Sequence, residues 1–177
     1  MMTVVIGPNG SGKSAAAEDL ARRSRAAAEP RGGLFYIATM VPADEDGRRR
    51  VAAHQQARSG AGFVTVESPL ADCQTTHAGL VEADDVVLLE DASNLLANLI
   101  FAAHDPAATA TALGRIHGLR QASRHLIVVT IGGLVAEAGF DAGTLAYIAA
   151  LDELNTILAA EADDLITTTG PTGGGEP

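Results

Sequence analysis

A loop motif close to the start of the chain constrains its fold more than any other feature. Residues 7–14 match the pattern GxxxxGK[ST], after the apolar run 3–6 and before a stretch with helical spacing. Glycines in such a loop let backbone N–H groups surround phosphate oxygens at the positive end of the following helix. We therefore expect a nucleoside triphosphate to bind here. The expected contacts are Gly7, Pro8, Asn9, Gly10, Ser11, Gly12, Lys13 and Ser14.

Two residues of the motif and one acid elsewhere carry the expected chemistry. Lys13 is the sole lysine of the chain, and its ammonium reaches the β- and γ-phosphates where a bulky guanidinium would not fit. Ser14 offers a hydroxyl oxygen to Mg²⁺. Glu90 ends the apolar run 86–89 and is the expected acid that holds Mg²⁺ through water, with Asp91 as its rival. Lys13 and Glu90 are thus predicted to be catalytic, and Ser14 and Glu90 to hold the metal.

Short apolar runs alternate with stretches of helical spacing along the chain. The expected strands are 3–6, 34–38, 63–66, 86–89, 126–130 and 165–168, and the expected helices are 14–28, 46–58, 92–103, 107–123 and 141–161. This alternation favours an α/β fold with a mostly parallel sheet and helices on both faces. With the loop motif it predicts a single-domain P-loop NTPase of the RecA-like type. We expect this domain to span 1–170, followed by a flexible Gly/Thr/Pro tail at 171–177.

Composition and charge exclude several classes of function. The chain has 22 acidic and 12 basic residues, a formal net charge of −10, which argues against a general nucleic-acid binder. No apolar run approaches the roughly 20 residues that span a bilayer, and no basic segment precedes the first apolar run, as a signal peptide would require. The single cysteine, Cys73, excludes an intrachain disulfide and a cysteine metal cluster. We expect a cytoplasmic protein without a membrane span.

Several further segments follow the loop in a fixed order. They are Tyr36-Ile37-Ala38-Thr39, the acidic patch 44–46, His54 with Arg58, Thr65-x-Glu67, Leu88-Leu89-Glu90, 93–98, Phe140-Asp141, Leu154-Asn155 and 160–163. This ordered set resembles the bifunctional adenosylcobinamide kinase/adenosylcobinamide-phosphate guanylyltransferase family of cobalamin biosynthesis. The resemblance runs from residue 3 to about residue 170. The chain departs from it at Ile131-Gly132, where the family usually carries Asn-Glu.

His54 is the candidate nucleophile. The expected helix 46–58 places Arg50, His54 and Arg58 on one face, because they are four residues apart. Guanidiniums on both sides disfavour the imidazolium, so the ring should be neutral near pH 7, and the arginines can hold phosphate oxygens. Without the resemblance, His54 is interpreted as a surface helix residue. The resemblance implies that it attacks the α-phosphate of GTP, expels pyrophosphate and carries GMP as a phosphoramidate.

The resemblance implies two transfers in one nucleotide pocket. First, ATP or GTP with Mg²⁺ gives its γ-phosphate to the hydroxyl of the aminopropanol arm of adenosylcobinamide. Then the GMP on His54 passes to that phosphate and gives adenosylcobinamide-GDP. The nucleotide contacts implied beyond the loop are Ala38, Thr39, Met40, Arg50, Arg58, Glu67 and Glu90. The resemblance also implies a homo-oligomer, a trimer, with the corrinoid near subunit contacts.

Three alternatives stay open at this point. The chain could be a single-activity small-molecule kinase in which His54 only packs. It could be a catalytically degenerate nucleotide-binding module, an alternative favoured by Ile131-Gly132. Glu67 could cap a helix rather than contact the guanine or ribose, and Asn94 and Asn98 are interpreted as buried hydrogen-bonding residues rather than substrate contacts.

Overall fold

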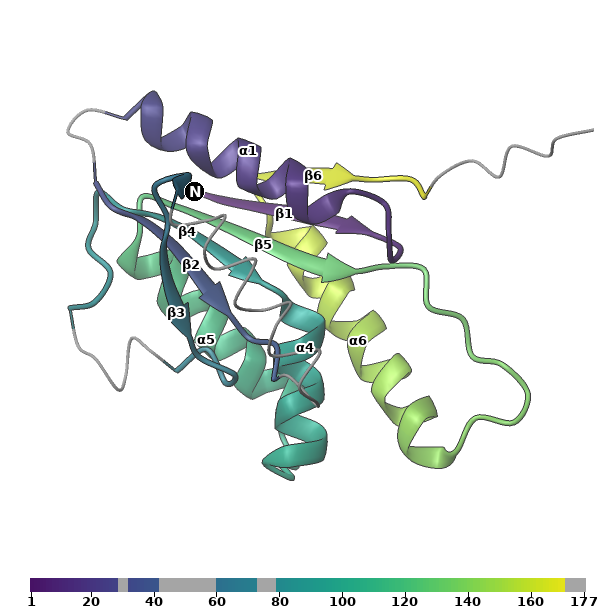
Figure 1. The fold of residues 1–177 in the computed structure, drawn as a ribbon. Coiled ribbons are helices and arrows are strands. Elements are labelled where there is room, and N and C mark those ends of the chain that lie inside the picture. Colours follow the sequence, from purple (N-terminus) through teal and green to yellow (C-terminus); the bar gives the residue numbers. More distant parts are fainter. Residues whose placement is uncertain (29–31, 42–59, 73–78, 171–177) are drawn as a thin grey trace, which may run out of the picture.

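A computed structural model describes residues 1–28, 32–41, 60–72 and 79–170 of the chain (Figure 1). Its strands are β1 (Met2–Gly7), β2 (Leu34–Ala38), β3 (Val64–Glu67), β4 (Val86–Glu90), β5 (His125–Ile131) and β6 (Asp164–Thr167). Its helices are α1 (Lys13–Ala26), α4 (Ala92–Ala97), α5 (Ala108–Ala122) and α6 (Ala142–Glu161), and a π-helical turn, η1 (Asn98–Ala102), continues α4.

All six strands belong to one parallel sheet in the order β3-β2-β4-β5-β1-β6. The central strands β4 and β5 are buried along nearly their whole length, which explains the apolar runs 86–89 and 126–129 within them. The edge strands β3 and β6 have four residues each and expose Val64 and Leu165. The expected α/β fold with a mostly parallel sheet is confirmed.

Helices cover both faces of this sheet, as the sequence predicts (Figure 1). Consecutive residues of a strand point to opposite faces, so Val5 packs in the cluster with Ala17 and Ala21 of α1, while Val4 packs in the cluster on the other face. That second cluster takes in α4, α5 and α6, through side chains such as Leu95, Ile116 and Leu154. The larger part of the core therefore lies between the sheet and these three helices.

The parallel arrangement brings the carboxyl ends of the strands to one edge. In the strand register, Ala38 of β2 lies between Glu67 of β3 and Glu90 of β4, and Gly7 of β1 lies opposite Ile131 of β5. Ligands of open parallel sheets bind beyond this edge. The loop motif, which follows Gly7, and Glu90 consequently meet there.

Apart from shifts of one or two residues at the ends of elements, the structure differs from the expected elements in one respect, and two expectations lie outside the described residues. The single helix expected over 92–103 is α-helical only to Ala97 and then widens into η1, where the Ala103 N–H donates to the carbonyl of Asn98. The side-chain amide of Asn98 donates to the carbonyls of Thr39 and Pro69, a tertiary contact that local sequence does not encode. The expected helix 46–58 and the expected tail 171–177 fall outside what the structure describes.

Candidate active site

The phosphate loop starts with a tight turn. The Ser11 N–H donates to the carbonyl of Pro8, and Gly10 at the third position of the turn has φ = 74°. Gly12 has φ = 78° and directly precedes α1. These positive values favour glycine, since side chains with a Cβ rarely adopt them. No side chain caps α1, whereas Asp91 caps α4, so the first N–H groups of α1 stay available to an anion.

Lys13 lies across this loop. It is the first residue of α1 and is 7% exposed, and its Nζ donates to the carbonyl of Pro8 at 3.3 Å. The ammonium is therefore held over the loop by a single long hydrogen bond, which phosphate oxygens can replace at little cost. A planar guanidinium would need more room than this buried position offers.

Ser14 and Glu90 meet at the end of β4. The Ser14 hydroxyl donates to Oε1 of Glu90 at 2.6 Å, which links the first turn of α1 to the carboxyl edge of the sheet. The structure thus brings together the two residues that the sequence predicts to hold Mg²⁺. Asp91, the rival acid, is turned away from this contact.

The Glu90 carboxylate is half-buried at the end of β4. Burial is the main cause that raises its pKa from 4.5 to about 7, and the charge of Asp91 adds to it, against the opposing effects of the Ser14 hydrogen bond and Lys13. Its Oε2 is buried and has no hydrogen-bond partner among the described residues. A hydroxyl and a carboxylate with a free lone pair are the oxygen donors that Mg²⁺ prefers. Ser14 and Glu90 therefore fit the divalent cation that nucleotide chemistry requires.

Asp91 has a structural task at the start of α4. Its carboxylate accepts from the Asn94 N–H at 2.7 Å and from the Ser93 hydroxyl. The Thr39 hydroxyl contacts the backbone of both acids. The carbonyl oxygens of Glu90 and Asp91 and the Asp91 N–H lie 2.8–3.0 Å from it. Thr39 is fully buried and does not line the cavity described next, although the sequence predicts a nucleotide contact.

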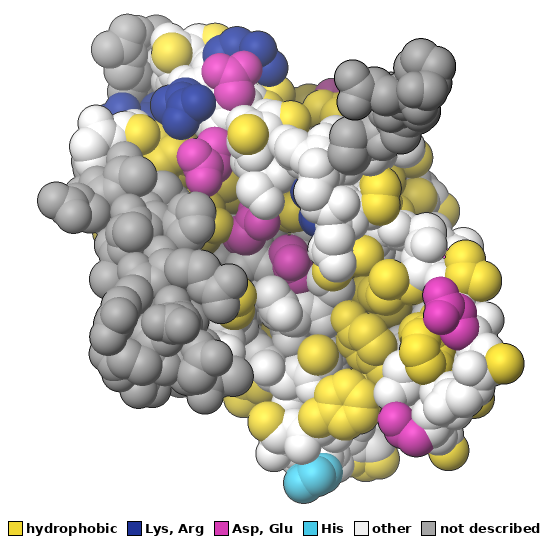
Figure 2. All heavy atoms as spheres, turned by 45° about the vertical axis from the view of Figure 1, so that its right-hand side comes forward, with side chains coloured by type: hydrophobic (Ala, Val, Ile, Leu, Met, Phe, Trp, Pro, Cys, Tyr) yellow, Lys and Arg dark blue, Asp and Glu magenta, His cyan; other side chains and the backbone are white. Residues whose placement is uncertain are grey.

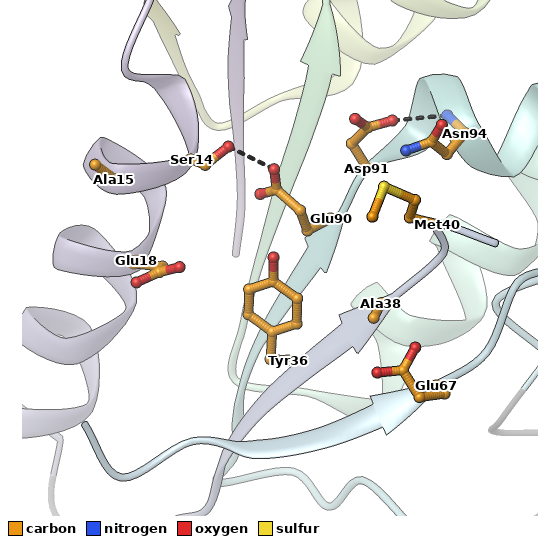
Figure 3. A pocket seen from close by; sticks show the side chains of 10 residues that line it. All are labelled: Ser14, Ala15, Glu18, Tyr36, Ala38, Met40, Glu67, Glu90, Asp91 and Asn94. Carbon is orange, nitrogen blue, oxygen red and sulfur yellow. Dashed lines mark hydrogen bonds between the residues drawn. The ribbon is translucent and has the colours of Figure 1, made fainter. Parts of the chain in front are cut away.

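A cavity of about 410 Å³ opens beside Glu90, between α1 and the ends of β2, β3 and β4 (Figure 3). Five residues expected in the site line it, namely Ser14, Ala38, Met40, Glu67 and Glu90, and they are joined by Ala15, Glu18, Tyr36, Asp91 and Asn94. The lining combines apolar side chains with four carboxylates, those of Glu18, Glu67, Glu90 and Asp91. Figure 2 shows acidic side chains in a hollow of this face and hydrophobic side chains gathered next to it.

Sequence reasoning missed part of this lining. Glu18 lies four residues after Ser14 on α1, and this spacing alone places both on one helix face. Asn94 lines the cavity, whereas Asn98 has the hydrogen-bonding role that the sequence predicts.

The residues predicted for the second transfer, Arg50, His54 and Arg58, lie outside the described residues. Within the described part of the chain, no group of three or more His, Cys, Asp or Glu side chains could hold a metal ion.

A family model for cobinamide kinase/cobinamide phosphate guanyltransferase matches residues 3–171 of the 177. The chain belongs to this family. The expected resemblance is confirmed, and so is the expectation of an enzyme of cobalamin biosynthesis with kinase and nucleotidyltransferase activity. No curated protein sequence matches significantly.

Solved structures support the fold of this cobinamide kinase family member. Significant matches number 37 chains and include a KaiC-like protein from the hyperthermophilic archaeon Pyrococcus horikoshii OT3. That likeness has a TM-score of 0.51 and 12% identity, and covers 95% of this chain and 70% of the other. This likeness confirms the RecA-like P-loop fold and concerns the fold alone. None of the described helices is long and apolar enough to cross a membrane.

Proposed function

We propose that this chain phosphorylates adenosylcobinamide with a nucleoside triphosphate and then transfers GMP from GTP to the product through a histidine–GMP intermediate. The main support for the first transfer is the 2.6 Å hydrogen bond between Ser14 and Glu90 next to the phosphate loop. It joins the hydroxyl and the carboxylate that Mg²⁺-dependent phosphoryl transfer uses on such folds.

The residues of the loop have separate tasks in the kinase step. Backbone N–H groups of residues 7–14 surround the phosphates, and the Lys13 ammonium offsets the negative charge on the β- and γ-phosphates. Ser14 and Glu90 would hold Mg²⁺, which when bound would supply positive charge next to the phosphates. The γ-phosphorus forms a bond to the acceptor oxygen, whose proton passes to solvent, and loses its bond to the β-phosphate oxygen, so that the nucleoside diphosphate leaves.

The cavity beside Glu90 suits the acceptor rather than the triphosphate. Carboxylates of Glu18, Glu67 and Glu90 on its lining repel phosphate groups that carry no cation. The same carboxylates accept hydrogen bonds from hydroxyl and amide groups, which are the donors on the aminopropanol arm of a cobinamide. We infer that this arm enters the cavity with its hydroxyl toward the γ-phosphate.

The second transfer is assigned to His54. Its support is the family membership together with the Arg50, His54, Arg58 spacing in the sequence. An imidazole nitrogen bonds to the α-phosphorus of GTP, the bond from that phosphorus to the bridging oxygen breaks, and pyrophosphate leaves. A phosphate oxygen of the cobinamide phosphate then attacks the same phosphorus, and the P–N bond breaks. Arg50 and Arg58 hold phosphate oxygens through both steps.

Hydrophobic side chains next to the site suggest where copies of the chain associate. Phe101, Leu134, Val135, Phe140 and Leu145 are each at least 40% exposed. We propose that a homo-oligomer, a trimer, covers part of this surface. Sedimentation of the purified protein tests the assembly, and a monomer at all concentrations would contradict it.

The position of a radioactive label tests the proposed function. Wild-type protein with adenosylcobinamide and γ-labelled ATP or GTP should give labelled adenosylcobinamide phosphate, and addition of α-labelled GTP should then give labelled adenosylcobinamide-GDP. Lys13→Ala is the matched control and should give neither product. A wild-type protein that labels no corrinoid with either nucleotide would contradict the proposal, and γ-label transfer alone would reduce it to a kinase.

A further inference from the structure

The last described residues of the chain lie against the phosphate loop. Strand β6 pairs with β1 on the side away from β4, and the chain continues past it along the base of the loop (Figure 1). The Thr168 N–H donates to the carbonyl of Ile6 at 2.9 Å, and the hydroxyls of Thr168 and Ser11 are 2.6 Å apart. Gly170 packs near Pro8, since a Cβ added to Gly170 would lie 3.5 Å from the Pro8 ring.

The hydroxyl pair occupies the space that the first glycine of the motif leaves open. A Cβ on Gly7 would lie 2.1 Å from Oγ1 of Thr168 and 2.9 Å from Oγ of Ser11, closer than atoms can approach. Gly7 is therefore required for the contact between Thr168 and Ser11 in addition to its place in the motif.

Either hydroxyl of this pair can be the donor, and the carbonyl of Ile6 offers a second acceptor to Thr168. Oγ1 of Thr168 also lies 3.5 Å from the carbonyl of Ile6, which can only accept. Because a hydroxyl has one proton, Thr168 donates to Ile6 when Ser11 donates to Thr168. In that arrangement the Ser11 proton is directed to Thr168, and in either arrangement the two hydroxyls join the phosphate loop to the segment after β6.

We propose that Thr168 is a positioning residue that holds the phosphate loop in its anion-binding conformation through the Ser11 hydroxyl. Gly10 and Gly12 flank Ser11, both with positive φ and with no heavy atom within 4 Å of an added Cβ. A segment with so few side-chain contacts loses conformational entropy when it becomes ordered around phosphates. A hydrogen bond that already holds the loop before the nucleotide binds lowers this entropic cost of binding. This inference rests on the proposed role of the loop in binding the triphosphate.

The affinity for a non-hydrolysable triphosphate with Mg²⁺ tests this role without any corrinoid. Thr168→Val removes the hydroxyl at constant shape and should raise Kd about fivefold, as loss of one neutral hydrogen bond of about 1 kcal/mol predicts. Thr168→Ser keeps the hydroxyl and should bind within about twofold of wild type. Thr167→Val is the matched control, because Thr167 is exposed and its side chain has no hydrogen bond to another described residue. It should bind like wild type.

A kinetic readout separates positioning from mere stability. In the kinase assay Thr168→Val should raise KM for the nucleotide by the same factor as Kd and leave kcat at saturating nucleotide little changed. A lower melting temperature with wild-type Kd and KM would overturn the proposal, as would a Thr168→Val variant that binds like wild type at unchanged stability.

A double-mutant cycle tests the route through Ser11. Ser11→Ala should weaken binding about as much as Thr168→Val, and the double variant should be no weaker than either alone. Factors that multiply in the double variant would overturn the proposal. If Thr168→Val does not fold, wild-type affinity of Ser11→Ala overturns the proposal instead.

The binding measurements also distinguish this proposal from the proposed function. A wild-type chain that binds no triphosphate would refute the proposed function of the loop. Failure of corrinoid labelling alone would leave the result for Thr168 unchanged.

Discussion

The Ser14 hydroxyl donates to Oε1 of Glu90 at 2.6 Å across 76 residues of sequence. The contact ties the first turn of α1 to the last residue of β4 and thereby fixes which of two adjacent acids faces the phosphate loop. Asp91 instead accepts from the Asn94 N–H and the Ser93 hydroxyl and caps α4. The geometry supports Glu90, and not Asp91, as the acid of the kinase step.

Replacement of the two acids should separate their tasks. Glu90→Gln keeps the shape but removes the charge that holds Mg²⁺, so kcat for γ-phosphate transfer should fall by at least about 10²-fold with the fold intact. Asp91→Ala should cost about 1 kcal/mol of stability through the lost helix cap. Steady-state kinetics and thermal unfolding measure both. A Glu90→Gln variant of full activity beside an inactive, folded Asp91→Asn variant would mean that the acids were assigned the wrong way round.

Glu90 should also make the ligand-free protein less stable as the pH rises. Its folded pKa of about 7 exceeds the ordinary 4.5, so between these values the unfolded chain is ionised while the folded protein keeps a proton. Stability is therefore highest below pH 4.5 as far as this group is concerned, and falls by up to about 3 kcal/mol by pH 7 and above.

Glu90→Gln should lose this dependence. At pH 8 without Mg²⁺ or nucleotide, the variant should melt at a higher temperature than wild type, and the difference should vanish near pH 4.5. Glu18→Gln, a change at another acid of the same cavity, which pairs with Arg22 on α1, is the control. Parallel pH profiles of wild type and Glu90→Gln would show that Glu90 titrates normally.

Lys13 should not tolerate substitution by arginine. It is nearly buried and bonded to the Pro8 carbonyl, so a guanidinium lacks room there. Both Lys13→Arg and Lys13→Ala should weaken triphosphate binding by at least about 10²-fold, measured by titration calorimetry, a loss of about 3 kcal/mol. Arg22→Lys, on the exposed side of α1, is a charge-conserving control. Wild-type affinity in Lys13→Arg would falsify the role given to this residue.

His125 should make stability depend on pH in the opposite direction. Its ring bonds to the hydroxyls of Thr3 and Ser24, and burial lowers its pKa from 6.5, with a smaller effect of the N-terminal ammonium. The neutral form is favoured on folding, so its contribution is complete above pH 6.5 and is lost as the pH falls toward the folded pKa. His125→Gln should flatten the pH dependence of the free energy of unfolding below pH 6.5, and an unchanged slope would contradict this.

The sequence predicts the central strands well. Burial on both faces of the sheet favours apolar residues at consecutive positions, and such runs can be recognised in the sequence. Strands β4 and β5 contain the apolar runs 86–89 and 126–129, whereas the edge strand β3 starts one residue later than expected. Phe63 precedes that strand and is buried in a core cluster, where its ring meets Tyr36 edge to face. An apolar residue buried by tertiary packing cannot be distinguished from a strand residue by its sequence.

The sequence predicts those parts of the candidate site that lie in short continuous motifs. The loop motif and the apolar run before Glu90 indicate which elements approach each other. Thr168 could not be found in this way, because its contact with Ser11 spans 157 residues and depends on the position of β6 beside β1. The turn at η1 is likewise set by the tertiary contacts of Asn98.

Retention of label from α-labelled GTP on the denatured protein, without corrinoid, tests the two-transfer account most directly. Wild type should retain about one label per chain in a bond stable to alkali and labile to acid, as expected of a phosphoramidate, and should release pyrophosphate. His54→Ala should retain none and still transfer γ-phosphate to adenosylcobinamide, and γ-labelled GTP should label neither protein. Normal labelling of His54→Ala, or no labelling of wild type, would contradict the account.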